Sequence, residues 1–206
     1  MTTLNRMDSR PMDARGYRVP WFVAWLDGQA DFRIVGPGKF KQAIQQDLCW
    51  ACGGKLGAHK AFVIGPMCGI NRTSAEPPCH LECAEYSATH CPFLINPAAV
   101  RRETKRPEGT KNPAGIMIKR NLGVTLIWVT KSYELFRADG GYLIEIGEPK
   151  RLIWYAKGRP ATREEVYESI ESGCHVLREV AEKESKDALQ EYEKRKQWIL
   201  ERIPTA

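Results

Sequence analysis

The chain has 206 residues, of which 43% are hydrophobic and 27% charged, and its formal net charge is +6. Such a composition leaves room for one sizeable core, alone or with a small metal-organised module. No apolar run is long enough for a membrane span and the first residues are polar, which argues against a membrane protein and against a secretory signal. Seven cysteines, an odd number clustered mainly between Cys49 and Cys91, favour metal ligands in a reducing compartment over a disulfide framework, so we expect a cytoplasmic protein.

The first part of the chain is predicted to contain a hairpin and a short helix. Residues 1–16 are polar and are expected to form a disordered arm. Apolar runs at 21–26 and 32–35 flank Asp27-Gly28, a dipeptide typical of tight hairpin turns because it tolerates positive φ. From 39 to 48 apolar residues recur at every fourth position, which indicates one face of a helix.

Two pairs of metal-ligating residues follow, each pair separated by two positions. Cys49 and Cys52 precede Gly53, and His80 and Cys83 come later in the chain. Three thiolates and one imidazole suit a closed tetrahedral zinc site. Because all four ligands come from the protein, the sequence predicts a structural Zn²⁺ with no open position for chemistry.

The elements between and after these pairs resemble a treble-clef zinc finger. The first pair reads as a tight knuckle, the apolar stretches 61–64 and 67–70 around Gly65-Pro66 predict a second hairpin, and 79–91 predicts a helix that carries the second pair. Knuckle, hairpin and helix is the order of the treble clef, and the resemblance covers residues 48–92. It implies a zinc module without naming a function, since treble clefs occur in nucleic-acid binders, nucleases, ribosomal proteins and protein-interaction domains.

Two alternatives for the metal ligands remain open at this point. Cys79 adjoins His80 and could replace it, although His80 and Cys83 match the two-residue spacing better. A second metal is conceivable at the remaining cysteines and histidine of this region, which are Cys68, Cys79, His90 and Cys91.

A nuclease interpretation also exists. The order His59, Asn71 and His80 resembles the three-residue signature of the HNH endonucleases, whose metal core is itself a treble clef. That resemblance implies a water-activating role for His59 and a catalytic metal on His80. The sequence departs from the pattern, because no acidic residue precedes His59 and His80 is already needed for the structural zinc.

A basic segment follows the zinc region. Residues 101–120 hold seven basic and two acidic residues, whereas residues 161–206 hold eight basic and eleven acidic ones. A basic centre points to an anionic partner, and a solvated loop is the simpler alternative. The residues expected to contact nucleic-acid phosphate are Arg101, Arg102, Lys105, Arg106 and Lys111.

The rest of the chain is predicted to be β-rich and then helical. Short strands at 116–118, 124–130, 133–136, 142–146 and 152–155 are separated by turn residues, which favours an antiparallel meander. Thr162 and Glu165 form a capping box at the start of a C-terminal helix, which Gly173 could divide.

The predicted fold class is therefore α+β, with a treble-clef-like zinc module joined to an antiparallel meander and a C-terminal helix. Four regions are expected: a disordered arm at 1–16, a hairpin plus zinc module at 17–100, a basic linker at 101–115, and a β and helical region at 116–206.

The function expected from the residues is that of a non-enzymatic zinc protein that contacts nucleic acid. A protein-interaction module that binds a host or defence factor is the second hypothesis, and a degenerate HNH-like nuclease is the third. The chain also resembles, loosely, small uncharacterised zinc-motif proteins of bacteria and their phages, through the 21–35 hairpin, the stretch 65–78 and the stretch 154–162. That resemblance implies an accessory role and no activity.

Overall fold

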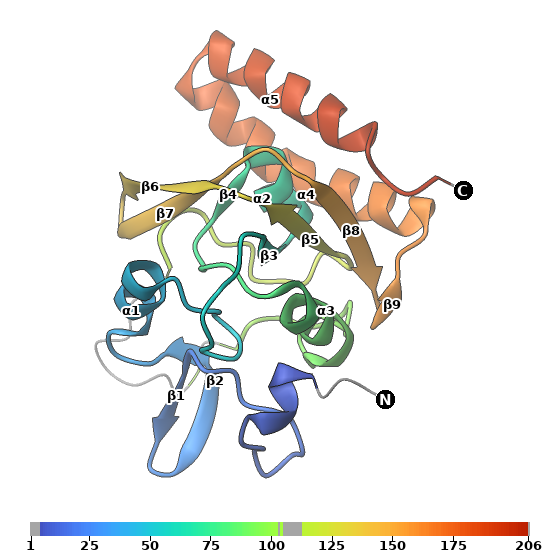
Figure 1. Ribbon diagram of the computed structural model, residues 1–206. Coiled ribbons are helices and arrows are strands. Elements are labelled where there is room, and N and C mark those ends of the chain that lie inside the picture. Colours follow the sequence, from blue (N-terminus) through green and yellow to red (C-terminus); the bar gives the residue numbers. More distant parts are fainter. Residues whose placement is uncertain (1–4, 103, 105–112, 206) are drawn as a thin grey trace.

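The computed structural model describes residues 5–102, 104 and 113–205 (Figure 1). The β1–β2 hairpin and the N-terminal segment lie at one end of the molecule, the two long C-terminal helices lie at the other, and the larger sheets lie between them. The elements are η1 (Arg6–Ser9), β1 (Val23–Leu26), β2 (Gln29–Val35), α1 (Lys39–Gln46), β3 (Lys60–Ile64), α2 (Pro66–Asn71), β4 (Thr73–Ser74), α3 (Leu81–His90), β5 (Thr125–Thr130), β6 (Tyr133–Ala138), β7 (Gly141–Ile146), β8 (Arg151–Ala156), β9 (Arg159–Pro160), α4 (Arg163–Glu184) and α5 (Lys186–Leu200).

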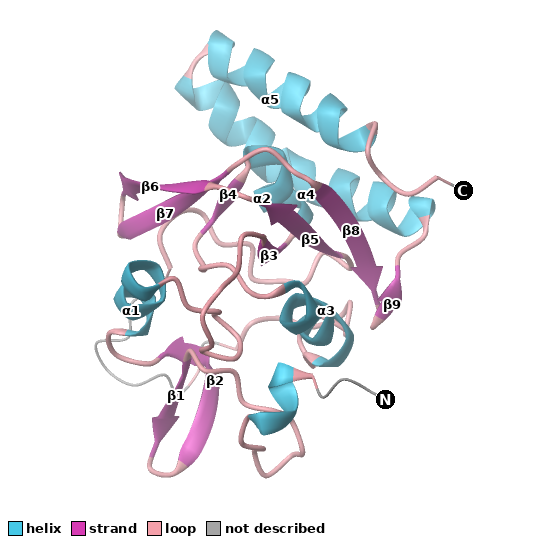
Figure 2. Cartoon of the chain, viewed as in Figure 1, coloured by secondary structure: helices cyan, strands magenta, loops and turns pink. Residues whose placement is uncertain are grey.

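The strands form three antiparallel sheets among the described residues (Figure 2). Their orders are β1-β2, β3-β5-β8-β9 and β4-β7-β6. The α+β class with antiparallel strands is confirmed. The strands after residue 120 do not form one continuous meander: β6 and β7 pair with each other and β7 also pairs with β4, whereas β5 pairs with β8 on one side and with β3 from the zinc region on the other.

β5 separates two hydrophobic cores. Its residues alternate between the two sides, as the pleat of a strand requires. Leu126 and Trp128 belong to the core formed with α2, α4 and α5, and Ile127 and Val129 belong to the core around α3 and the cysteines. All six residues of β5 are buried, so this strand has no solvent face.

Several predicted elements are confirmed near their expected bounds. Asp27 and Gly28 both have positive φ between β1 and β2, which the two-residue turn requires. Thr162 accepts a hydrogen bond from the Glu165 amide while the Glu165 side chain accepts one from the Thr162 amide, so the capping box starts α4 as predicted.

The predicted second hairpin is wrong. The strand expected there forms β3, but the chain then enters helix α2 in place of a returning strand. Pro66 occupies the first turn of α2, where its missing N–H costs nothing and its fixed φ suits the helix. β3 instead finds its partner in β5, more than sixty residues later.

Three smaller expectations also differ from the structure. Part of the expected disordered arm is the helix η1, in which Met7 is buried and Arg6 forms an ion pair with Glu82 of α3. Residues 116–118 form no strand, and Ile116 is exposed. Gly173 does not divide the C-terminal helix; the break falls at Ser185, whose extended backbone ends α4 and whose hydroxyl caps α5.

Candidate metal centre

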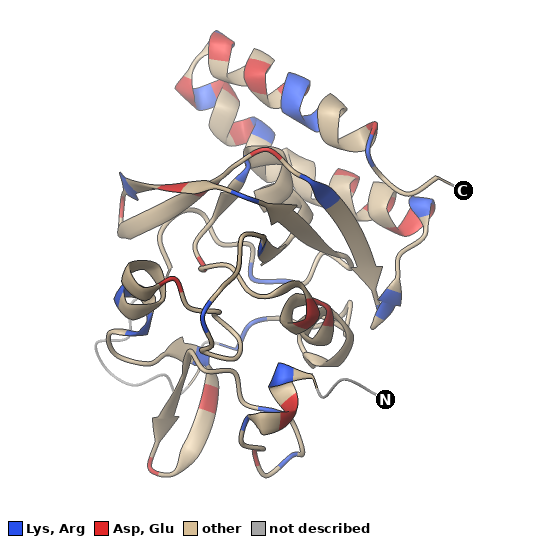
Figure 3. Ribbon diagram, viewed as in Figure 1, with Lys and Arg blue, Asp and Glu red and all other residues tan. Residues whose placement is uncertain are grey.

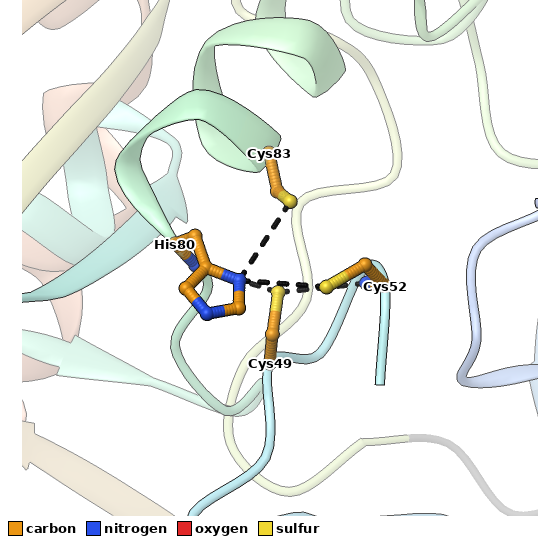
Figure 4. A group of neighbouring side chains, drawn as sticks. All are labelled: Cys49, Cys52, His80 and Cys83. Atoms are coloured by element: carbon orange, nitrogen blue, oxygen red, sulfur yellow. Dashed lines mark hydrogen bonds between the residues drawn. The ribbon is translucent and has the colours of Figure 1, made fainter. Parts of the chain in front are cut away.

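The four residues of the predicted zinc site lie together. Each offers one ligand atom, and the four atoms all lie within 4.8 Å of one another. Cys49 and Cys52 come from the turn after α1, His80 is the N-cap residue of α3, and Cys83 lies in the first turn of that helix (Figure 4). Cys49 and Cys83 are buried, and Cys52 and His80 are half-buried.

The distances between these atoms suit a tetrahedral metal ion. The Nδ1 atom of His80 lies 3.4 Å from Cys52 Sγ and 3.9 Å from Cys83 Sγ. Zinc–sulfur bonds of about 2.3 Å and zinc–nitrogen bonds of about 2.0–2.1 Å at a tetrahedral angle place sulfur and nitrogen about 3.6 Å apart. The observed spacing brackets this value, so the cluster could hold a metal ion.

His80 is oriented by its second ring nitrogen. Nε2 lies 2.9 Å from the carbonyl oxygen of Lys55, to which a protonated Nε2 donates a hydrogen bond. That bond leaves Nδ1 unprotonated toward the three sulfurs, which is the state a metal-ligating imidazole needs. The ring is therefore held in the tautomer that fits a metal.

Backbone amides surround the sulfur atoms. The amides of Cys52 and His80 each donate to Cys49 Sγ at 3.4 Å, and the amide of Gly54 donates to Cys52 Sγ at the same distance. Hydrogen bonds from N–H groups favour the thiolate form that a metal requires. The predicted knuckle, with amides approaching the sulfurs, is present.

Gly53 makes the knuckle fit against the N-terminal hairpin. Its φ is +80°, and a Cβ at this position would lie 2.5 Å from the Cδ1 atom of Trp21. Only glycine satisfies both conditions, because other residues rarely adopt this φ and would collide with the indole. Lys39 covers the same indole, with its ammonium group 3.9 Å from the ring centroid.

The thiols interact with one another. The pKa of Cys49 is lowered, chiefly because Cys52 donates a hydrogen bond to it, and Cys79 and Cys83 also contribute. The pKa of Cys83 is raised, first by its hydrogen bond to Cys49 and then by the one to Cys52. These thiols therefore lie within hydrogen-bonding reach of one another.

Cys79 lies next to the cluster and not inside it. It is buried and hydrogen-bonded to Cys49, but its sulfur is not one of the four mutually close ligand atoms. Within the described part of the chain no second group of three or more metal-ligating side chains comes together, so Cys68, Cys79, His90 and Cys91 do not form a further site.

Positive side chains lie beside the cluster, a feature that the sequence analysis missed. Burial lowers the pKa of Arg10, and the charge of Cys52 partly offsets this. Arg6 Nη1 approaches Gly54 of the knuckle. A zinc ion with three thiolates has a net charge of −1, and the nearby positive charges of Arg6 and Arg10 would stabilise it. The arm was expected to be disordered, so nothing in the sequence placed its arginines here.

The three residues of the nuclease interpretation come from three different segments of the chain. His59 is exposed in the segment before β3, and Asn71 is the last residue of α2, where its carbonyl oxygen accepts a hydrogen bond from Arg195. His80 faces the three cysteine sulfurs.

The basic segment begins against the N-terminal hairpin. Arg33 of β2 donates hydrogen bonds to the carbonyl oxygens of Arg102 and Thr104, and the Arg101 side chain donates to the carbonyl oxygen of Arg33. Lys105, Arg106 and Lys111 lie outside the described residues.

No helix in the described part of the chain has the length and apolar character needed to cross a membrane. Comparison with protein-family models, with curated proteins and with solved structures found no match to this chain.

Proposed function

We propose that the protein is a non-enzymatic zinc-binding protein that contacts nucleic acid through its basic segment. The carrying observation is the Cys49, Cys52, His80 and Cys83 cluster, whose spacing and hydrogen bonds suit zinc. Four protein ligands fill a tetrahedral ion, so no bound water is available for activation, and the metal serves structure.

The position of the basic segment supports a nucleic-acid role. Its first residues are tied to β2 by the hydrogen bonds of Arg33 and Arg101, and Trp21, just before β1, packs on Gly53 of the knuckle. A basic chain anchored at one end to this hairpin can follow a phosphate backbone and release its counterions. No pattern for reading base edges is present, so we propose binding without sequence choice.

The salt dependence of binding tests this role. We expect replacement of Arg101, Arg102, Lys105 and Arg106 by alanine to weaken DNA binding and flatten its dependence on salt. Arg101 also holds the β2 contact, so a triple variant that keeps Arg101 is the cleaner test. For three lost phosphate contacts we expect the log–log salt slope to fall by about 2–3.

The matched control removes three positive charges from the C-terminal helices in place of the basic segment. Lys183, Lys186 and Lys194 are exposed on α4 and α5, and their replacement by alanine should leave the slope unchanged. Zinc content should be equal in both variants. If the unaltered protein binds no nucleic acid at low salt, the segment is a solvated linker and the proposal is wrong.

A protein-interaction role is the second candidate, and one observation favours it. α4 carries seven acidic and three basic residues, and acidic positions occur along both C-terminal helices (Figure 3). A shallow depression of about 230 Å³ on α4 is lined by Arg163, Glu164, Tyr167 and Glu168. A basic partner protein would suit this surface. Loss of partner binding in Tyr167→Ala, with nucleic-acid binding absent from the unaltered protein, would favour this candidate.

A further inference from the structure

We propose that one face of the β1–β2 hairpin stacks the bases of single-stranded nucleic acid, with Trp25 as the principal platform. This inference rests on the proposed nucleic-acid role and adds a contact that the basic segment does not provide. The hairpin forms a separate sheet that pairs with no other described strand, and it lies at the end of the molecule opposite α4 and α5 (Figure 1).

Aromatic side chains share this face. Trp25 lies directly opposite Ala30, and the pairing register shifts beyond Asp31. Within β2 the Arg33 side chain still donates to the Asp31 carboxylate at 2.8 Å, so these two share one face. Ala30 and Phe32 share the other face, with Trp25. Trp25 is 45% exposed, although an indole of this size is usually covered. Its ring is thus open to a flat ligand.

Arg15 extends the aromatic surface. Its guanidinium group lies 5.3 Å from the centroid of Phe32 and 5.4 Å from that of Tyr17. An ion pair with Asp13 at 2.7 Å holds it in place, while 60% of the Arg15 side chain remains exposed. A planar guanidinium that is stacked and fixed in this way is itself a surface on which a base can stack.

The charge of this region selects an anionic occupant. Arg33 of β2 holds the start of the basic segment, whose Arg102 is exposed, and Arg15 adds an exposed cation beside the aromatic rings. A ligand with flat apolar rings and a negative backbone is a nucleic acid. Only a single strand exposes the faces of its bases, because in a duplex they are covered by neighbouring base pairs.

Two substitutions separate ring stacking from simple apolar contact. We expect Trp25→Leu to weaken binding of the zinc-loaded full chain to a single-stranded oligothymidine of about 20 nucleotides by about five-fold or more, since base–aromatic stacking contributes this much or more. Trp25→Tyr keeps a ring and should bind within about two-fold of the unaltered protein. Binding is measured by fluorescence anisotropy. A duplex of equal length and an oligouridine serve as comparison ligands.

The control is Tyr167→Leu on α4, which removes an aromatic ring that is 51% exposed in the acidic part of the molecule. Tyr167→Leu should change neither the affinity for the single strand nor that for the duplex. The Trp25 variants should leave duplex binding unchanged. Equal single-strand affinity in Trp25→Leu and the unaltered protein would overturn the stacking inference while leaving the basic-segment proposal standing. Absence of binding to every nucleic acid by the unaltered protein would overturn the proposed function and this inference with it.

Discussion

The hydrogen bond between His80 Nε2 and the carbonyl oxygen of Lys55 decides which ring nitrogen meets the sulfurs. The acceptor belongs to the backbone, so it does not depend on the identity of residue 55. Its position instead depends on the knuckle turn, which Gly53 permits by its positive φ. One turn therefore positions two thiols and also sets the tautomer of the imidazole across the site.

Substitution of single cysteines tests the ligand set. We expect Cys52→Ser to lose bound zinc and to be destabilised by several kcal/mol, because the binding free energy of a structural zinc, about 10–16 kcal/mol in small zinc fingers, is folding free energy. Cys79→Ser should keep one zinc per chain, since Cys79 lies beside Cys49 and not among the four close ligand atoms. Elemental analysis and thermal unfolding measure both effects.

The reverse result would change the assignment. If Cys79→Ser loses the metal and His80→Ala keeps it, then Cys79 is the fourth ligand. Cys91→Ser, a half-buried cysteine outside the cluster, controls for the general effect of removing a thiol.

At the residue scale the sequence predicted which four side chains meet and the tight turn that holds two of them, but not the groups that surround them. Cys49 and Cys52 have the two-residue spacing of a knuckle turn, and His80 and Cys83 have the same spacing at the start of a helix. Both local conformations are common in zinc sites, so the ligand set could be predicted from spacing alone. The contact of Cys79 with Cys49 and the approach of Arg10 depend on tertiary packing, which no short spacing encodes.

The capping box of α4 has a pH dependence that can be measured. Hydrogen bonds from Arg159, then from the Thr162 amide, lower the pKa of Glu165 from its ordinary 4.5 to about 2. The unfolded chain therefore takes up the proton first as the pH falls, and the stabilisation by Glu165 is complete above pH 4.5 and is lost toward pH 2. Glutamine can still accept from the Thr162 amide, so Glu165→Gln removes the ion pairs with Arg159 and Lys157, and we expect a cost of about 0.5–1 kcal/mol at pH 7 and progressively less in this window.

Urea unfolding of the two proteins from pH 7 down to the acid limit of folding measures the difference. Glu164→Gln is the matched control, because it removes the same charge one residue earlier in the same helical turn. A cost for Glu165→Gln that stays constant down to pH 2 would contradict the prediction.

Helix starts and turns that a few neighbouring residues specify could be predicted from the sequence. The Asp27-Gly28 turn and the Thr162–Glu165 box each specify their own conformation. Gly65-Pro66 was ambiguous, because Gly-Pro is compatible with a turn and also with a helix start, and the short apolar stretch after it has no clear period. The strands after residue 120 were found from their composition, but their division into two sheets was not, since pairing between distant strands leaves no local signal.

At the scale of the whole molecule the zinc region and the C-terminal half should unfold together. β3 follows the knuckle and pairs along its full length with β5, so the two halves share one sheet. We expect removal of zinc by a chelator to lower hydrogen-exchange protection in β5 and β8 as well as in α3. Exchange followed by mass spectrometry measures this. Unchanged protection in β8 would mean that the two cores are independent.

The burial of β5 on both faces has a consequence for insertions. Adjacent residues of this strand enter different cores, so a slip of one position would send Trp128 into the core beside the cysteines and Ile127 into the core beside the helices. A single inserted residue within 125–130 would thus spoil both cores at once. The same insertion in the turn at 139–140, at the tip of the β6–β7 hairpin, would leave every buried pairing in place. Length variation should therefore be excluded from β5 and concentrated at that hairpin tip.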